Sequence, residues 1–252
     1  MQNKDVKKAA ELILNSRYLT AFTGAGISVE SGIPPFRGKD GIWNKYDPAL
    51  FDLDNYLRDP SGALKLRQVF YDVIEKAKPN AAHLALAELE KMGLLRGVIT
   101  QNIDNLHFLA GNTKVLEFHG NTRYFVCMNC GAKYKVEDVK IEEGKKPVCP
   151  KCGGLLKPDF VFFGEPIPPD VYHESFDMAR KSDVMLVIGT TGLVQPAALI
   201  PLVAKENGAR IIEVNIEPST YTYEGVTDIF LQGKATEVMT QLLEEVKRLK
   251  SK

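Results

Sequence analysis

The chain has 252 residues, of which 44% are hydrophobic and 25% are charged, values near the average for folded globular proteins. Disordered and fibrous classes therefore fit poorly, and the length suits one large domain or a domain that carries a smaller insertion. The 32 basic residues balance 32 acidic ones, which removes the long-range positive field expected of a protein that mainly binds nucleic acid.

Short apolar runs and amphipathic helical patterns alternate along the chain. Runs rich in β-branched and aromatic residues predict buried strands at 19–23, 97–100, 115–118, 160–163, 184–188, 211–215 and 229–231. Apolar residues that return every three or four positions predict helices at 81–91, 170–181, 196–207 and 236–249. This alternation predicts an α/β fold in which a parallel sheet has helices on both faces.

Two stretches break the alternation. Residues 38–79 have a loop and helix pattern with a helix start at Asp59-Pro60, and residues 121–157 hold the cysteines among Gly, Lys and Pro. We expect both to form a smaller domain inserted in the sheet domain, which would comprise residues 1–37, 80–120 and 158–252. Clefts between such domains, beside the carboxyl ends of parallel strands, commonly bind nucleotides.

The N-terminal stretch 1–16 is charged and helical in pattern, without the apolar core of a signal peptide. No later stretch approaches the ~18–20 apolar residues that a membrane-spanning helix needs. We therefore expect a cytoplasmic protein with no membrane partner.

All four cysteines fall in the pattern Cys127-x-x-Cys130, eighteen residues, then Cys149-x-x-Cys152. Two such pairs can present four thiolates tetrahedrally to one Zn²⁺ at ~2.3 Å. Four protein ligands leave no open coordination position, so the expected zinc is structural. Two disulfides or free thiols are the alternative, which the spacing and a reducing compartment oppose.

A glycine-rich stretch, Gly24-Ala25-Gly26-Ile27-Ser28, follows the first predicted strand and continues through Phe36-Arg37-Gly38. Glycines in this position let the backbone approach a pyrophosphate, and a following helix start offers N–H groups. The dehydrogenase fingerprint fails, because Val29 stands where its third glycine would be. The stretch therefore predicts a dinucleotide site of another kind.

Polar residues follow two further predicted strands. Asn102 and Asp104 come after the run at 97–100, and His119 comes after the run at 115–118. An amide and a carboxylate can hydrogen-bond a carboxamide or a water, and an imidazole with an ordinary pKa of ~6.5 suits a general base. Each residue alone is more often a turn residue or a structural histidine. We assign no chemistry to the remaining histidines, which are His83, His107 and His173.

The combined motifs resemble the sirtuins, over nearly the whole chain. Besides the glycine-rich stretch and the cysteines, the resemblance rests on Gln101-Asn102-Ile103-Asp104, Leu106-His107, His119-Gly120, Phe163-Gly164-Glu165, Gly189-Thr190-Thr191, Val194-Gln195-Pro196-Ala197 and Asn215-Ile216-Glu217. It implies a Rossmann-like NAD-binding domain, a small domain made of a zinc ribbon and a helical module, and a cleft between them where NAD⁺ and acyl-lysine meet.

The resemblance also implies roles for individual residues. Catalytic roles fall on His119, Asn102 and Asp104. Contacts with NAD⁺ fall on Gly24, Ala25, Gly26, Ile33, Phe36, Arg37, Gln101, Asn102, Ile103, Asp104, Gly189, Thr190, Thr191, Asn215, Ile216, Glu217 and Ala235. The substrate backbone would form an added strand between two segments, one made of Val161, Phe162, Phe163, Gly164 and Glu165 and the other of Gly192, Leu193 and Val194.

The implied activity is NAD⁺-dependent deacylation of lysine side chains in a protein or peptide. Holding the acyl oxygen against the ribose carbon that bears nicotinamide makes the displacement effectively intramolecular. His119 would then act as general base on the ribose hydroxyls, and the products would be free lysine, nicotinamide and acyl-ADP-ribose.

Two positions depart from the family pattern. Pro35 stands where many sirtuins carry Asp, which stiffens the loop and removes a charge. Sirtuins that prefer succinyl or malonyl groups carry Tyr-x-x-Arg, and the aligned residues here are Arg67 and Phe70. We therefore expect acetyl or longer uncharged acyl groups.

Two other functions stay open from the sequence. A zinc-ribbon nucleic-acid-binding protein would use the lysines of the ribbon, although acidic residues largely offset their charge. A mono-ADP-ribosyltransferase or NAD⁺ glycohydrolase would keep the scaffold and change the acceptor. His119 argues for deacylation, because breaking the glycosidic bond needs no base on a ribose hydroxyl.

Overall fold

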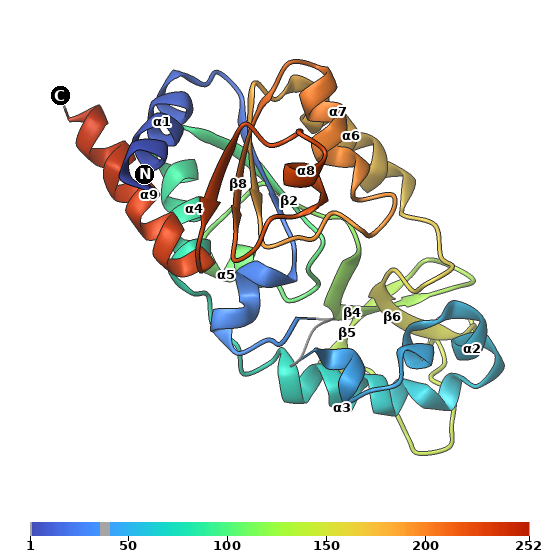
Figure 1. Ribbon diagram of the computed structural model, residues 1–252. Helices are drawn as coiled ribbons and strands as arrows, with labels where there is room; N and C mark the ends of the chain where they lie inside the picture. The colour runs from blue at the N-terminus through green and yellow to red at the C-terminus, as the bar shows by residue number, and fades with distance from the viewer. Residues whose placement is uncertain (1, 36–40, 252) are drawn as a thin grey trace.

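The computed structural model describes residues 2–35 and 41–251. Figure 1 shows a larger lobe built on a sheet and a smaller lobe that carries α2, α3 and the strands β4–β6. Both chain ends lie on the larger lobe, away from the smaller one (Figure 1). Within the described residues, no helix combines the length and the apolar character needed to cross a membrane.

The larger lobe contains a six-stranded sheet in the order β3-β2-β1-β7-β8-β9. All of its neighbouring strands pair in parallel. The strands are β1 (Leu19–Thr23), β2 (Leu95–Thr100), β3 (Val115–Glu117), β7 (Val184–Ile188), β8 (Arg210–Asn215) and β9 (Ile229–Gln232). This is the strand order of a Rossmann sheet, in which the chain reverses its winding direction at the central pair, here β1 and β7.

Helices cover both faces of this sheet. One face packs against α1 (Gln2–Asn15), α4 (Ala81–Lys91) and α9 (Ala235–Lys250), with α5 (Leu106–Ala110) beside α4. The other face packs against α6 (Pro169–Lys181), α7 (Leu199–Glu206) and α8 (Thr220–Tyr223). The central strands β1 and β7 are buried along their whole length, which explains why they are continuous apolar runs without alternation. The expected α/β class is confirmed.

The smaller lobe has two cores of its own. Its helical part comprises α2 (Leu53–Arg58), α3 (Ala63–Val73) and the 3₁₀ turns Ile42–Asn44, Pro48–Phe51 and Pro60–Gly62. The turn at 60–62 starts where Asp59-Pro60 predicted a helix start, and the Asp59 carboxylate accepts a hydrogen bond from the Ser61 N–H at 3.1 Å. An antiparallel sheet in the order β5-β4-β6 holds the second core, with β4 (Gly120–Cys127), β5 (Lys133–Lys135), the turn Val136–Asp138 and β6 (Leu156–Phe160).

One predicted strand was placed wrongly. The run 160–163 was expected in the parallel sheet, but only Phe160 lies in a strand, and that strand is β6 of the small antiparallel sheet. The aromatic residues of this run are buried for another reason. Phe160 stacks on Phe162 with ring centroids 4.4 Å apart, and both pack against the aromatic core of the helical module. An apolar run alone does not distinguish a strand buried in a parallel sheet from a segment buried against an aromatic core.

Candidate active site

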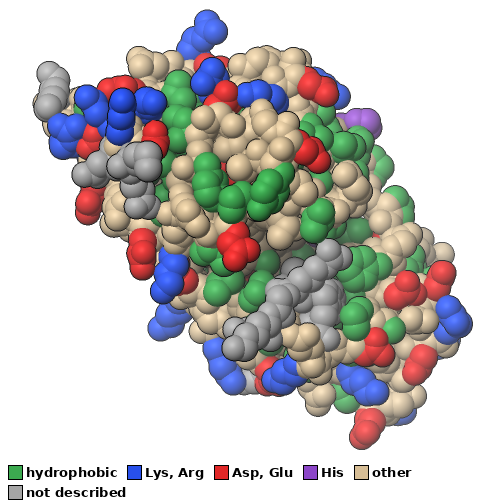
Figure 2. Space-filling model, in the orientation of Figure 1, with side chains coloured by type: hydrophobic (Ala, Val, Ile, Leu, Met, Phe, Trp, Pro, Cys, Tyr) green, Lys and Arg blue, Asp and Glu red, His purple; other side chains and the backbone are tan. Residues whose placement is uncertain are grey.

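The reversal of winding between β1 and β7 opens a crevice at the carboxyl ends of these strands. The chain leaves β1 through the 3₁₀ turn η1 (Ala25–Ser31) toward α4 on one face, and it leaves β7 toward α7 on the other. Figure 2 shows hydrophobic side chains gathered on this side of the molecule where the two lobes meet.

Glycines at the crevice are required by the close approach of two loops. The Gly26 N–H donates to the Gly189 carbonyl at 2.8 Å, and a Cβ on Gly26 would lie 2.6 Å from the Gly189 Cα. A Cβ on Gly24 would lie 2.8 Å from the Gly189 oxygen. Because these glycines have no side chains, the loop after β1 can contact the loop after β7 directly.

A buried cluster of polar groups lies beneath this loop. Ser28 Oγ donates to Asp104 Oδ2 at 2.7 Å and accepts from Asn102 Nδ2 at 3.1 Å. Asn102 Nδ2 also lies 3.1 Å from the Gly24 carbonyl. Burial raises the pKa of Asp104, while its bonds from Ser28 and from the Leu106 N–H act in the opposite direction. The cluster presents amide and carboxylate groups to the same corner of the crevice.

Two buried histidines, to which the sequence assigns no chemistry, lie next to this cluster. His83 Nδ1 accepts the Asn80 N–H at 3.3 Å, so Nε2 carries the proton and faces Ser28 Oγ at 3.4 Å. His107 Nε2 lies 2.9 Å from Thr23 Oγ1, and the two imidazole centroids are 5.0 Å apart. Burial lowers the pKa of His83 to about 4 and that of His107 to about 3. Both rings are therefore neutral at neutral pH.

His119 has the geometry of a general base. Its Nδ1 lies 3.1 Å from the Gln101 carbonyl oxygen, which can only accept, so Nδ1 carries the proton and Nε2 keeps its lone pair. The Phe118 ring packs edge-on at 5.5 Å. Burial lowers the pKa of His119 below 6.5, and the bond to Gln101 opposes this shift. The ring is thus neutral and able to accept a proton at neutral pH.

A further group of residues expected to contact NAD⁺ forms a connected edge at the ends of β2, β7 and β8. Gln101 Nε2 donates to Thr190 Oγ1 at 3.0 Å, and Asn215 Nδ2 donates to the Thr190 carbonyl at 2.9 Å. The Ile216 N–H is 3.0 Å from Asn215 Oδ1, and the Ile216 side chain is 62% exposed. Thr191 and Glu217 are exposed on the same edge, and Ala235 is the first residue of α9.

A mostly apolar pocket extends from the polar cluster toward the helical module. Ala25, Ser28, Asn102 and Asp104 line one end, and Ile33, Pro34 and Ile103 continue it. The other end consists of side chains from the small lobe, namely Ile42, Phe51, Val69, Phe70, Val73 and Ile74. An apolar pocket with a few convergent polar groups is the usual form of a small-molecule site.

None of the described residues that line this pocket is cationic, and Arg67 is not among them. Its guanidinium lies 3.4 Å from the Val139 carbonyl, and Phe70 packs on Phe51 and Phe160. Pro35 accepts the Ile42 N–H at 2.8 Å through its carbonyl. Phe36 and Arg37, expected to contact NAD⁺, lie outside the described residues.

The two segments expected to hold the substrate backbone carry exposed apolar side chains. Phe163 is 50% exposed, Leu193 is 56% exposed and Val194 is 37% exposed. The Val161 N–H donates to the His119 carbonyl at 2.8 Å, which connects the first segment directly to the histidine. Gly192 is held against α8, because Thr220 Oγ1 lies 3.3 Å from its carbonyl.

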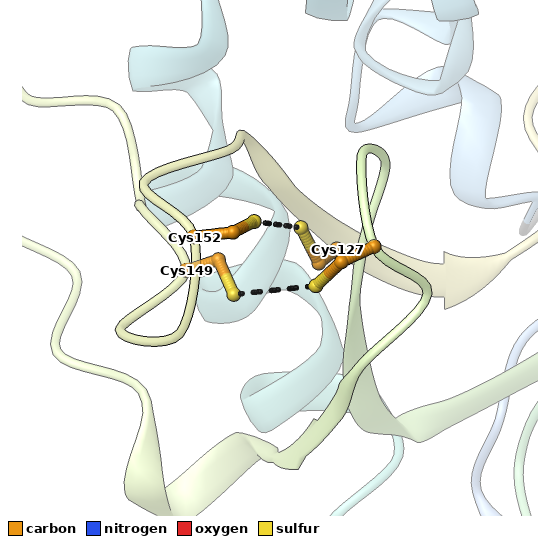
Figure 3. A group of neighbouring side chains, drawn as sticks. Cys127, Cys149 and Cys152 are labelled. Atoms are coloured by element: carbon orange, nitrogen blue, oxygen red, sulfur yellow. Dashed lines mark hydrogen bonds between the residues drawn. The ribbon is translucent and has the colours of Figure 1, made fainter.

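The four cysteines converge at one end of the small sheet. All four sulfur atoms lie within 4.8 Å of one another, with Cys127 and Cys152 at 3.5 Å and Cys130 and Cys149 at 3.8 Å (Figure 3). A tetrahedral ZnS₄ centre with ~2.3 Å bonds requires sulfur atoms about 3.8 Å apart, whereas a disulfide requires about 2.05 Å. The donor set therefore fits one zinc ion and not two disulfides.

Sequence reasoning missed Ser28, His83 and Lys157 as functional candidates. Ser28 was noted only as part of the glycine-rich stretch. His83 was set aside, although Asn80 three residues before it forms a reciprocal capping box that turns the ring toward the crevice. Lys157 is buried between the expected substrate segment and the small sheet, a position that only the fold reveals.

A model described as the Sir2 family matches residues 24–196 of the chain. The NAD-dependent protein deacylase 2 of Pyrobaculum aerophilum is 49% identical over 240 residues, which cover 95% of each chain. The NAD-dependent protein deacylase of Pyrococcus abyssi is 48% identical over 249 residues, which cover 97% of this chain and 99% of that protein.

Solved structures agree over nearly the whole chain. A mutant Sir2 homologue in complex with ADP-ribose has a TM-score of 0.88 at 43% identity and covers 97% of each chain. A mutant Sir2 with a deacetylated p53 peptide and 3′-O-acetyl-ADP-ribose has a TM-score of 0.86 at 38% identity, covering 95% of this chain and 98% of the other. A Sir2 protein bound to a myristoylated histone peptide has a TM-score of 0.80 at 38% identity and covers 99% of each chain. The chain therefore belongs to the Sir2 family, the sirtuins.

Proposed function

We infer that the chain is an NAD⁺-dependent protein lysine deacylase. The observation that carries this conclusion is a neutral imidazole whose Nδ1 is bonded to the Gln101 carbonyl, so that Nε2 is available as a base at the edge of the crevice. Relatives that are 48–49% identical over nearly the whole chain are NAD-dependent deacylases and deacetylases. NAD⁺ is the co-substrate, and one structural Zn²⁺ is the metal.

The residues at the crevice are proposed to have the following roles. His119 accepts the proton of a ribose hydroxyl at Nε2. Asn102 and Asp104 orient the carboxamide and a water at the buried end of the pocket, together with Ala25, Ile33, Phe36 and Ile103. The remaining NAD⁺ contacts are proposed at Gly24, Gly26, Arg37, Gln101, Gly189, Thr190, Thr191, Asn215, Ile216, Glu217 and Ala235.

NAD⁺, when bound, would supply the ribose carbon at which the acyl oxygen displaces nicotinamide, and the hydroxyls that then take over the acyl group. The chain contributes alignment, exclusion of water and the base. Enclosing the reacting groups between the lobes makes the displacement effectively intramolecular and limits hydrolysis of the cofactor. Cys127, Cys130, Cys149 and Cys152 would hold the zinc, which stabilises the small sheet and has no open position for substrate.

The substrate is an acyl-lysine in a peptide or protein, as the p53 and histone peptides of the related structures illustrate. Its backbone is proposed to pair with Val161–Glu165 on one side and with 192–194 on the other. Since Arg67 is directed at the Val139 carbonyl and Phe70 is part of an aromatic cluster, we propose a preference for acetyl or longer uncharged acyl groups over succinyl and malonyl groups.

We also propose the division into domains that the sequence suggested. Residues 1–37, 80–120 and 158–252 would form the NAD-binding domain, and 38–79 and 121–157 the small domain. The boundary at 157/158 falls within β6, a strand of the small antiparallel sheet.

The test is incubation with NAD⁺ and a panel of acyl-lysine peptides, comparing the wild type with His119→Ala. The wild type should form free lysine and acyl-ADP-ribose, detected by mass spectrometry, and the variant should keep its fold and zinc but lose turnover. Unimpaired turnover in His119→Ala would remove this histidine from the mechanism. A product in which ADP-ribose is attached to protein would favour a mono-ADP-ribosyltransferase instead.

A further inference from the structure

A buried ion pair lies directly behind the proposed substrate segment. Lys157 on β6 is 7% exposed, and its ammonium lies 3.1 Å from Glu165 Oε2. The ammonium also donates to the carbonyl oxygens of Pro158 at 3.0 Å and of Phe160 at 2.9 Å. An ammonium has three N–H donors, so this site satisfies all of them. The Phe162 ring, 5.3 Å away, adds a cation–π contact.

The carboxylate of the pair closes the turn that presents Phe163. The Glu165 N–H donates to the Phe162 carbonyl at 3.0 Å, and Glu165 Oε2 accepts the Phe162 N–H at 3.0 Å. Gly164, at φ +84°, supplies the left-handed residue that this turn requires. The turn is therefore held by reciprocal hydrogen bonds, and the carboxylate that makes one of them is neutralised by Lys157.

Such a pair is costly to place inside a protein unless every partner is present. The pair helps to hold the conformation of residues 162–165, together with the hydrogen bonds that the Phe163 backbone makes with Phe51 and Leu53 of the helical module. Backbone pairing with a peptide requires this conformation to exist before the peptide binds.

We propose that the Lys157–Glu165 pair positions the segment that binds the acyl-peptide. The pair thereby determines the affinity for the peptide without affecting NAD⁺ binding or the chemical step. The proposal rests on the deacylase function above. It predicts separable effects, because the His119 imidazole is held through Nδ1 by the Gln101 carbonyl after β2 and not by the turn at 162–165. The pair therefore holds the turn and not the imidazole.

The experiment measures steady-state kinetics with an acetyl-lysine peptide for Lys157→Met, Glu165→Gln and the double variant. Lys157→Met should raise the KM for the peptide at least tenfold, while the KM for NAD⁺ and kcat change less than threefold. Because the two residues act as a unit, the double variant should raise the peptide KM about as much as the larger single effect rather than by the product of both. Direct calorimetric titration with the peptide should show the same ranking.

The matched control is Lys133→Met, which removes the exposed Lys133–Asp159 ion pair between β5 and β6 of the same sheet. Its peptide KM should equal that of the wild type. Zinc content and melting temperature report whether each variant folds. If Lys157→Met does not fold, Glu165→Gln still tests the pair, because glutamine keeps the side-chain volume and an oxygen that accepts the Phe162 N–H.

If the wild-type enzyme is active, any one of three results would overturn the proposal. They are an unchanged peptide KM in both single variants, an equal rise in the KM for NAD⁺, or multiplicative effects in the double variant. A wild type that deacylates no peptide would instead refute the deacylase function, and this inference with it.

Discussion

At the scale of single residues, the bond between His119 Nδ1 and the Gln101 carbonyl determines how the imidazole can act. A carbonyl oxygen cannot donate, so the proton stays on Nδ1 and the lone pair stays on Nε2. Burial lowers the pKa of the ring, which keeps it in the basic form at lower pH than a free histidine. Both features favour a base over an acid at this position.

The pH dependence of deacylation follows from this shift. A base must be unprotonated, so kcat/KM should fall as pH falls through the folded-state pKa of His119, which lies below its ordinary 6.5. The acid limb of the profile should therefore lie below about pH 6.5. In His119→Ala the rate should be lower by roughly 10²–10⁴ and this limb should be absent. An acid limb that survives in the variant would assign the titration to another group.

The position of His119 at the edge of the sheet could be predicted from the sequence, as could the polar positions Asn102 and Asp104, but the contributions of Ser28 and His83 could not. His119-Gly120 is a local motif that follows a predicted strand, so its position at the edge of the sheet could be inferred. Ser28, His83 and Asp104 come from three separate segments, and only the fold brings Ser28 Oγ within hydrogen-bond distance of both His83 and Asp104. The Asn80 cap three residues before His83 predicts a helix start, but it does not reveal that the ring lies beside Ser28.

The buried His83 gives a stability prediction with a defined sign. Its pKa is about 4 in the folded protein and 6.5 in a free histidine, so the unfolded chain binds the extra proton. The stabilisation from a neutral His83 is fully present above pH 6.5 and is lost progressively as pH falls toward 4. The shift corresponds to a loss of about 2 kcal/mol between pH 8 and pH 5.

The measurement is urea unfolding of the wild type and His83→Gln at both pH values. The variant should lose less stability on acidification than the wild type, whatever its absolute stability. His173→Gln, at an exposed position on α6, should match the wild type. Identical acid losses in all three proteins would mean that His83 is not buried in its neutral form.

At the scale of elements, the predicted helices and strands of the larger lobe agree with the structure, while the small lobe was harder to predict. The strand at 19–23 and the helix at 81–91 have the predicted bounds, because a continuous apolar run and a clear helical period are local signals. The strands β4, β5 and β6 were not predicted. Their side chains alternate poorly, because several face the cysteine cluster or the aromatic core rather than a continuous sheet face.

The zinc site should stabilise these short strands. Three strands of this size around a core that includes two of the four cysteines depend on a metal for much of their stability. We expect Cys130→Ser, or exposure to a strong chelator, to remove the zinc and raise hydrogen exchange throughout β4–β6. The amides of β1 and β7 should stay protected, because the cores on both faces of the large sheet contain no cysteine.

Met128→Ser is the control for this prediction. Met128 lies within the same Cys-x-x-Cys pair and is 43% exposed, so its replacement should leave both zinc content and exchange unchanged. Stoichiometric zinc in Cys130→Ser would show that the four sulfur atoms do not act together as the ligand set.

At the scale of the whole molecule, the crevice exists because the two halves of the sheet meet at β1 and β7. The contact between Gly26 and Gly189 joins the halves, and the proposed NAD⁺ residues come from both. A ligand that spans this contact should bind only when both loops keep their positions. Ligand binding therefore reports on the integrity of the whole fold and not on one segment.

ADP-ribose, the ligand of a related structure, provides the test. At a concentration of 100 Kd it should stabilise the wild type by about 2.7 kcal/mol, which raises the melting temperature by roughly 5–10 °C for a chain of this size. Gly26→Ala places a Cβ 2.6 Å from the Gly189 backbone, so the loops must separate. This variant should melt at a lower temperature and show little stabilisation by the ligand.

Gly62→Ala is the matched control, because its Cβ would meet nothing within 4 Å and its φ of −60° suits alanine. It should keep the full ligand shift and melt at or slightly above the wild-type temperature. A full ligand shift in Gly26→Ala would mean that the dinucleotide does not depend on the junction of the two halves.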